Sequence, residues 1–238
     1  MKDETNRPSG YSPSEWANIN FFGNYCNFSD HLNEISDYLQ EFQNYIQVTN
    51  HHLQNGRISG HDNEQLELMK FNFQHSHGDI LRLSTIISLY ILLETEMDEY
   101  CKTFKKHSGG QIKLSDFKGD LLERFKTYSK KVIEIPFDFG SSLWQFIIGL
   151  HEVRNCLVHN NGIIEGFGKR KVIEHFAEHQ NLITIRDDYF LDITFNGCRE
   201  SIEQVDRLFA TITELAFDRF PGSYRLKKAT EFELPILK

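Results

Sequence analysis

The sequence predicts a mostly helical protein with one small β-hairpin. Apolar residues recur at helical spacing over long stretches, and the 238 residues include only five prolines to interrupt helices. Twenty phenylalanines and nine tyrosines supply large side chains for a helical core. Short segments near residues 182–194 instead alternate apolar and polar residues, as strands do. We therefore expect a helical bundle with a hairpin inserted near its C-terminal end.

The N-terminal residues 1–28 mix prolines and glycines with polar and aromatic residues, which predicts an irregular arm that packs onto the rest of the protein. Ser29 is the expected N-cap of a first helix that runs to about Leu53. Residues 29–220 are expected to form one helical domain, followed by a C-terminal tail, 221–238.

Two further helices are expected in the middle of the chain. A loop at residues 55–60 precedes a long helix over residues 62–107, in which Gly78 is a breaker that can kink the helix. After a glycine pair, Ser115 is the expected cap of a third helix over residues 116–132.

The last third of the chain changes its pattern twice. A fourth helix is expected to begin at Ser141 or Ser142. Residues 182–186 and 189–194 flank two aspartates and predict the hairpin. Apolar spacing over residues 202–217 then predicts a final helix that ends before Pro221.

Composition excludes several classes of protein. The net charge of −8 argues against a protein that coats nucleic acid. No apolar run approaches the roughly 20 residues that span a bilayer, and the first residues form no signal peptide, so we expect a cytoplasmic protein without a membrane partner. The cysteines are scattered singly and the remaining histidines form no ligand set, so we expect neither a metal site nor a cofactor.

The segment 154–162, Arg-Asn-Cys-Leu-Val-His-Asn-Asn-Gly, carries the clearest chemical signal. Three apolar residues at helical spacing precede it, and Arg154 takes the next position on their stripe. Asn-Asn-Gly is a helix stop, which leaves His159 in the last turn. A cation and a titratable imidazole therefore close an otherwise apolar helix.

Arginine, a polar residue, three residues and histidine are the signature of the HEPN superfamily, which the segment RNCLVH at 154–159 resembles. Residues 170–175 fit the same bare spacing, but they have a lysine at the polar position, lack the helix stop and show poor helical periodicity. The resemblance implies an all-α, up-and-down bundle that forms a homodimer, with two motif helices facing each other in one composite site. It further implies a metal-independent endoribonuclease of prokaryotic defence or toxin–antitoxin systems, with RNA as substrate and an antitoxin or defence protein as a possible partner.

The resemblance assigns catalysis to Arg154 and His159. A guanidinium pairs two phosphate oxygens and keeps its charge, and an imidazole titrates near neutrality, so these residues suit RNA cleavage. Asn155 either orients a phosphate or faces water. The alternative is structural: Arg154 then forms an ion pair, and His159 is a capping cation. The corresponding alternative function is a noncatalytic helical dimer that acts as a regulatory or partner-binding module, which the acidic charge favours.

Glu94 is the expected supporting residue, because it interrupts the apolar stripe of the long helix. A buried carboxylate needs a partner, and Arg154 is the natural one. Alternatively, a kink at Gly78 turns Glu94 into solvent, and Glu96 or Asp98 takes its place.

Overall fold

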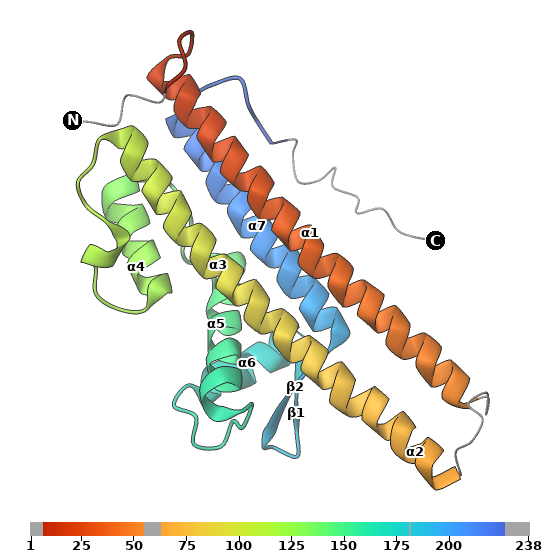
Figure 1. The fold of residues 1–238 in the computed structure, drawn as a ribbon. Coiled ribbons are helices and arrows are strands. Elements are labelled where there is room, and N and C mark those ends of the chain that lie inside the picture. The colour runs from red at the N-terminus through yellow and green to blue at the C-terminus, as the bar shows by residue number, and fades with distance from the viewer. Residues whose placement is uncertain (1–6, 55–62, 181, 227–238) are drawn as a thin grey trace. The chain divides into compact units, whose positions relative to one another are not determined.

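The computed structural model describes residues 7–54, 63–180 and 182–226 of the chain (Figure 1). The described residues are mostly helical and include one antiparallel two-stranded hairpin. The predicted mostly helical class with a small hairpin is therefore confirmed. The loop expected at 55–60 and most of the C-terminal tail lie outside the described residues. The elements, in chain order, are α1 (Pro13–Gln54), α2 (Asn63–Phe71), the π-helical segment η2 (Asn72–His77), α3 (Gly78–Ser108), the 3₁₀ turn η3 (Leu114–Asp116), α4 (Leu121–Tyr128), the π-helical segment η4 (Ser129–Ile133), α5 (Ser142–Asn160), α6 (Arg170–Gln180), β1 (Ile183–Arg186), β2 (Phe190–Ile193) and α7 (Phe195–Arg219).

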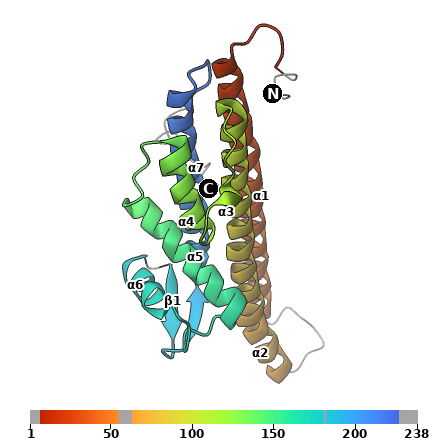
Figure 2. The ribbon, with the colours of Figure 1, turned by 90° about the vertical axis from the view of Figure 1, so that its left-hand side faces the viewer.

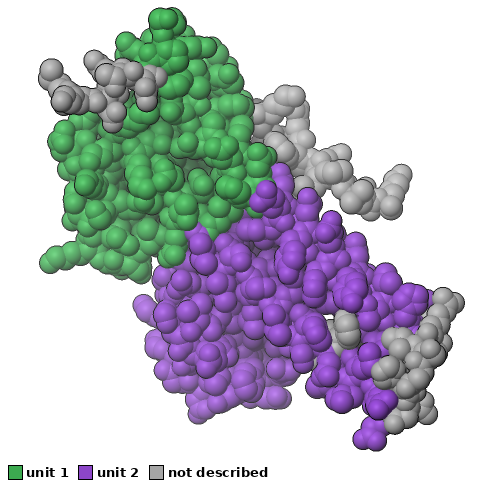
Figure 3. All heavy atoms as spheres, in the orientation of Figure 1, with its two compact units in different colours: residues 1–31, 92–148, 204–238 green, residues 32–91, 149–203 purple. Residues whose placement is uncertain are grey.

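The chain forms two compact units, each assembled from separate stretches of sequence (Figure 3). Unit 1 contains residues 1–31, 92–148 and 204–238, and unit 2 contains residues 32–91 and 149–203. Helices α1, α3, α5 and α7 each contribute residues to both units. The domain limits expected from the sequence do not coincide with these units.

Unit 1 is built around aromatic side chains from the first turns of α1, the end of α3 and most of α7. The Phe28 and Phe209 ring centroids are 4.5 Å apart, and the Tyr100 hydroxyl donates to the Ile212 carbonyl oxygen over 2.8 Å. Trp144, at the start of α5, is 1% exposed and packs edge-on against Phe139 with ring centroids 4.9 Å apart. The core therefore depends on large rings, as the composition predicts.

Unit 2 contains the second half of α5 together with α6 and the hairpin, which lie beside it (Figure 2). Phe176 of α6 packs against Gly149 of α5, where an added Cβ would lie only 2.2 Å from the ring. The absent side chain at Gly149 is therefore what allows the two helices this close approach. The hairpin forms where the sequence predicts it, with Ile183 opposite Ile193 and Arg186 opposite Phe190.

The prediction of an irregular N-terminal arm is wrong for residues 13–28, which belong to α1. Ser29 lies inside this helix rather than at its start. Glu15 N donates to Ser12 Oγ over 3.2 Å, and Ser12 N donates to Glu15 Oε2 over 2.8 Å. This reciprocal capping box, followed by proline at the first helical position, starts the helix at Pro13.

Three other features of the helices also differ from the prediction. Asp120, rather than Ser115, caps the third helical region, because its carboxylate accepts from Glu123 N over 2.9 Å. The expected break near Gly78 is a π-helical segment, η2, that ends directly before this glycine. Residues 170–180 form the helix α6, so the expectation of poor helical periodicity in this segment is wrong. Among the described helices, none combines the length and the apolar character that crossing a membrane requires.

Candidate active site at the end of helix α5

Helix α5 ends where the sequence predicts. Asn161 (φ 52°) and Gly162 (φ 75°) adopt the left-handed conformation, and Gly162 N donates to Cys156 O over 3.1 Å. The Asn160 side-chain amide donates to two carbonyl oxygens of the following loop. These hydrogen bonds satisfy the end of the helix and fix the last turn, which carries His159.

This part of α5 carries a group of polar side chains. His151, Asn155 and His159 follow one another at intervals of four residues, and Arg154 lies beside them. Residues four apart lie one above another on a helix, so the three form a continuous stripe. Arg154 and Asn155 are half-buried, whereas His159 is exposed.

Three of these side chains form a hydrogen-bonded chain with Tyr90 of α3. Arg154 Nη1 donates to Asn155 Oδ1 over 3.1 Å, Asn155 Nδ2 lies 2.9 Å from His151 Nε2, and His151 Nδ1 contacts the Tyr90 hydroxyl. Tyr90 is fully buried. The buried phenol therefore anchors a polar chain that ends at the guanidinium.

The direction of this chain follows from Arg154, because a guanidinium is only a donor. The amide atom of Asn155 that faces it must be the oxygen, so the NH₂ group points to His151 Nε2. Nε2 then accepts, and the ring proton of neutral His151 resides on Nδ1 and faces the Tyr90 oxygen. One cation thus determines the tautomer of an imidazole two side chains away.

The guanidinium of Arg154 is held on two sides. Its Cζ atom lies 5.2 Å from the centroid of the Tyr90 ring, within the range of a cation–π interaction. Its Nε is buried, and within the described part of the chain it has no hydrogen-bond partner. A buried donor without an acceptor is costly, so the other contacts of the guanidinium must hold it in this position.

His159 lies one turn beyond Asn155 and is exposed. Val158, the residue before it, is 42% exposed although it is apolar. The end of α5 therefore presents an imidazole and an apolar side chain together to solvent.

A hollow of about 310 Å³ adjoins the end of α5 in unit 2. Gly162 lines it, together with two ion pairs, Arg82–Asp79 and Arg186–Asp192, the latter 3.4 Å long. Each arginine is paired with a carboxylate, so the charge of the hollow is balanced. It is wide enough for a small ligand but does not favour an anion.

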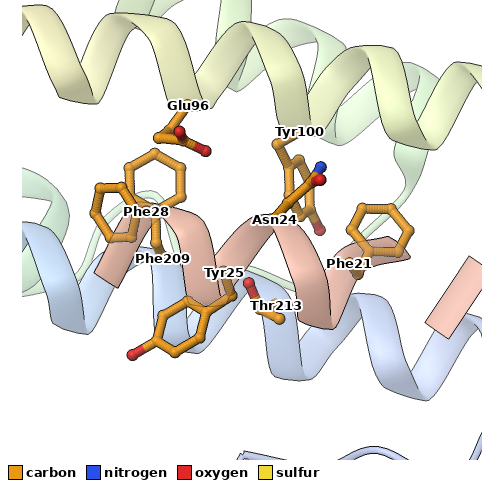
Figure 4. A pocket seen from close by; sticks show the side chains of 8 residues that line it. All are labelled: Phe21, Asn24, Tyr25, Phe28, Glu96, Tyr100, Phe209 and Thr213. Carbon is orange, nitrogen blue, oxygen red and sulfur yellow. The ribbon is translucent and has the colours of Figure 1, made fainter. Parts of the chain in front are cut away.

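Unit 1 contains a separate hollow lined by Glu96 and by aromatic side chains of α1, α3 and α7 (Figure 4). Its volume of about 10 Å³ corresponds to the space of one water molecule. Burial raises the pKa of Glu96, the charge of Glu99 raises it further, and His31 lowers it. Glu96, one of the expected substitutes for Glu94, thus lies in a mostly apolar setting in unit 1.

Glu94 is half-buried and belongs to unit 1, whereas Arg154 belongs to unit 2. Their pairing stays a prediction. The contacts that the structure gives for Arg154 are to Asn155 and Tyr90.

Two residues of this site escaped the sequence analysis: His151 and Tyr90. The spacing of four between His151, Asn155 and His159 was the available signal for the first. Tyr90 looks like any other core residue on its helix, and only the fold brings its hydroxyl to His151, 61 residues away in the chain.

A second correction concerns metal ligands. His175, Glu178 and His179 on α6 bring ligand atoms within 4.8 Å of one another. The expectation that the remaining histidines form no ligand set is therefore wrong for His175 and His179. The spacing of four between the histidines would reveal the set once residues 170–180 are recognised as a helix.

Comparisons with protein-family models, with curated proteins and with solved structures gave no match to this chain.

Proposed function

We propose that this protein is a metal-independent endoribonuclease of the HEPN type, acting as a homodimer in a prokaryotic defence or toxin–antitoxin system. The motif at 154–159 supports this function, and the geometry of Arg154 supports it most directly. The guanidinium is held by Asn155 and Tyr90. The side chain is half-buried rather than fully enclosed. A positioned guanidinium of this kind is suited to bind a phosphate.

The proposed reaction is an intramolecular phosphoryl transfer. The RNA 2′-hydroxyl loses its proton and attacks the neighbouring phosphorus, the bond to the 5′-oxygen breaks, and that oxygen takes up a proton. The products are a 2′,3′-cyclic phosphate and a 5′-hydroxyl end. Arg154 stabilises the charge that develops on the phosphate oxygens, and His159 acts as the base or the acid.

Asn155 and His151 act through Arg154 in this scheme. The Asn155 amide donates to the imidazole and accepts from the guanidinium, so its two hydrogen bonds fix the amide plane. We assign both residues a positioning role. The Tyr90 hydroxyl anchors the chain from the core.

A second copy of the chain completes the proposed site. Arg154 and His159 are five residues apart, which separates their directions by about 140° on an ideal helix. One helix therefore presents them poorly to one phosphate. Val158, exposed and one turn beyond Arg154, provides an apolar contact for the same helix of a second copy. Across a twofold axis, Arg154 of one protomer approaches His159 of the other.

A noncatalytic dimer that binds a regulatory partner is the second candidate function. Its supporting observations are the net charge of −8 and two exposed isoleucines on α3, Ile80 at 64% and Ile91 at 53%. Exposed apolar side chains of this size suit a protein partner, such as an antitoxin or another defence component.

An RNA cleavage assay in EDTA tests the leading proposal. We expect the purified protein to leave 2′,3′-cyclic phosphate ends, and Arg154→Ala and His159→Ala each to lower the rate by roughly 100-fold or more. Arg154→Lys keeps the charge but loses the planar fork, so it should restore little activity. His52→Ala, at an exposed histidine of α1, is the matched control and should retain the full rate.

A latent nuclease is silent in such an assay, so growth of cells provides the deciding comparison. Overexpressed wild type should be toxic in the presence of its trigger, and the Arg154→Ala/His159→Ala variant should be harmless. Equal growth with every suspected trigger present would favour the noncatalytic function.

A further inference from the structure

Helix α6 carries a group of three metal-ligating side chains: His175, Glu178 and His179. One ligand atom from each lies within 4.8 Å of the other two, and all three residues are exposed. Residues three and four apart share one face of a helix, so the backbone of α6 brings the group together by itself. The group is separate from the motif residues of α5.

The opposite face of α6 holds this group in place. Ile173 is fully buried and Phe176 is 6% exposed, and the Phe176 ring packs directly on Gly149 of α5. Arg170 Nε donates to Glu174 Oε1 over 2.6 Å, which adds an ion pair across one turn. The metal-ligating face is therefore presented by an anchored helix rather than by a loop.

One of the two imidazoles already has the orientation that a metal ligand needs. His179 Nδ1 lies 2.8 Å from the carbonyl oxygen of His175. A carbonyl oxygen only accepts, so Nδ1 carries the proton and donates it. Nε2 then carries a lone pair for a metal ion. A hydrogen bond from the second ring nitrogen to a backbone carbonyl is the usual support of a metal-ligating histidine.

The two imidazole rings lie close together, with centroids 4.0 Å apart. Two histidines and a carboxylate are the ligands that Zn²⁺ and its neighbours in the first transition row prefer, and water can complete a four-coordinate site. Mg²⁺ and Ca²⁺ prefer oxygen ligands and suit this group poorly. We infer that His175, Glu178 and His179 form a surface binding site for a divalent transition-metal ion, with Zn²⁺ as the expected occupant.

Isothermal titration of the full-length protein with ZnCl₂, after removal of bound metal, tests this site. We expect one Zn²⁺ per chain at neutral pH, with His175→Ala and His179→Ala each weakening binding by roughly tenfold or more. Glu178→Gln should weaken Zn²⁺ binding less, because an amide oxygen can still bind the metal ion although it carries no charge. Mg²⁺ under the same conditions should give no binding at this site.

Two control variants separate this site from other zinc-binding groups. His52→Ala removes an exposed histidine of α1, and Cys26→Ser removes the partly exposed thiol. Both should bind Zn²⁺ as the wild type does. Circular dichroism confirms that each variant remains helical. The inference is overturned if the wild type binds no Zn²⁺, or if folded His175→Ala and His179→Ala bind it unchanged. Because binding is measured without RNA, the result does not depend on the proposed nuclease activity.

Discussion

The Arg154 guanidinium donates to the Asn155 side-chain oxygen over 3.1 Å. This hydrogen bond determines which atom donates in the next contact of the chain, between Asn155 and His151. Asn155 in turn donates to His151, whose protonated Nδ1 faces the Tyr90 oxygen. The arrangement joins the half-buried charge of Arg154 to a phenol in the core. It also makes the tautomer of His151 a measurable property of the site.

We expect NMR spectra of ¹⁵N-labelled protein to show His151 as the Nδ1–H tautomer at pH values where the ring is neutral. Asn155→Ala removes the donor to Nε2, so the Nε2–H form, the commoner one in water, should become populated. The exposed ring of His52 is the internal reference and should not change. An Nε2–H tautomer in the wild type would contradict the hydrogen-bond direction derived from Arg154.

Val158→Asp is expected to weaken the homodimer. The side chain is 42% exposed on the motif face, and a carboxylate there would be desolvated in a twofold contact. Light scattering at a protein concentration of roughly tens of micromolar should show a dimer for the wild type and a monomer for the variant. Val48→Asp, at a valine of α1 that is 54% exposed, should leave the dimer intact. A monomeric wild type would remove the composite site.

Gly149→Ala should destabilise unit 2 by about 1–3 kcal/mol, because the new methyl group meets the Phe176 ring. Gly23 offers a matched control in α1, where an added Cβ has no neighbour within 4 Å. Gly23→Ala should stabilise the protein by about 0.5–1 kcal/mol through helix propensity alone. Urea denaturation followed by circular dichroism measures both changes. Equal effects of the two substitutions would mean that α6 does not pack as described.

Glu94→Gln tests the predicted pair with Arg154. If the carboxylate neutralises the guanidinium, the substitution should lower the free energy of unfolding by about 1–3 kcal/mol. A double-mutant cycle with Arg154→Met isolates the coupling between the two residues. Glu99→Gln, which removes an exposed ion pair with Lys102, should cost less than about 1 kcal/mol. A coupling energy near zero would show that Glu94 is not the partner.

Local signals in the sequence predicted the motif region well. The Asn-Asn-Gly stop depends on residues that tolerate positive φ, and the structure has positive φ at Asn161 and Gly162. The hairpin turn follows the same rule, since Asp187 (φ 57°) and Asp188 (φ 52°) both adopt the left-handed conformation. Such features are encoded within a few residues, so the sequence alone reveals them.

Features that depend on distant packing were missed. Helix α6 is short and has few apolar residues, so its sequence gave little sign of a helix, although Ile173 and Phe176 lie on one buried face and the Phe176 ring packs on Gly149. The contact of Tyr90 with His151 has no local signature. The start of α1 is different, because Ser12 and Glu15 form a capping box that the sequence shows and that the prolines nearby obscured.

The composition of the two units has a consequence for synthesis on the ribosome. Unit 1 joins the first turns of α1 to residues 204–219 of α7, and unit 2 needs residues from α1, α3, α5 and the start of α7. Neither core can close while the nascent chain is still short, so contacts must form late and between segments far apart in sequence. Both cores should therefore close only after α7 has been synthesised, and the apolar faces of α1 and α3 stay without their α7 contacts until then.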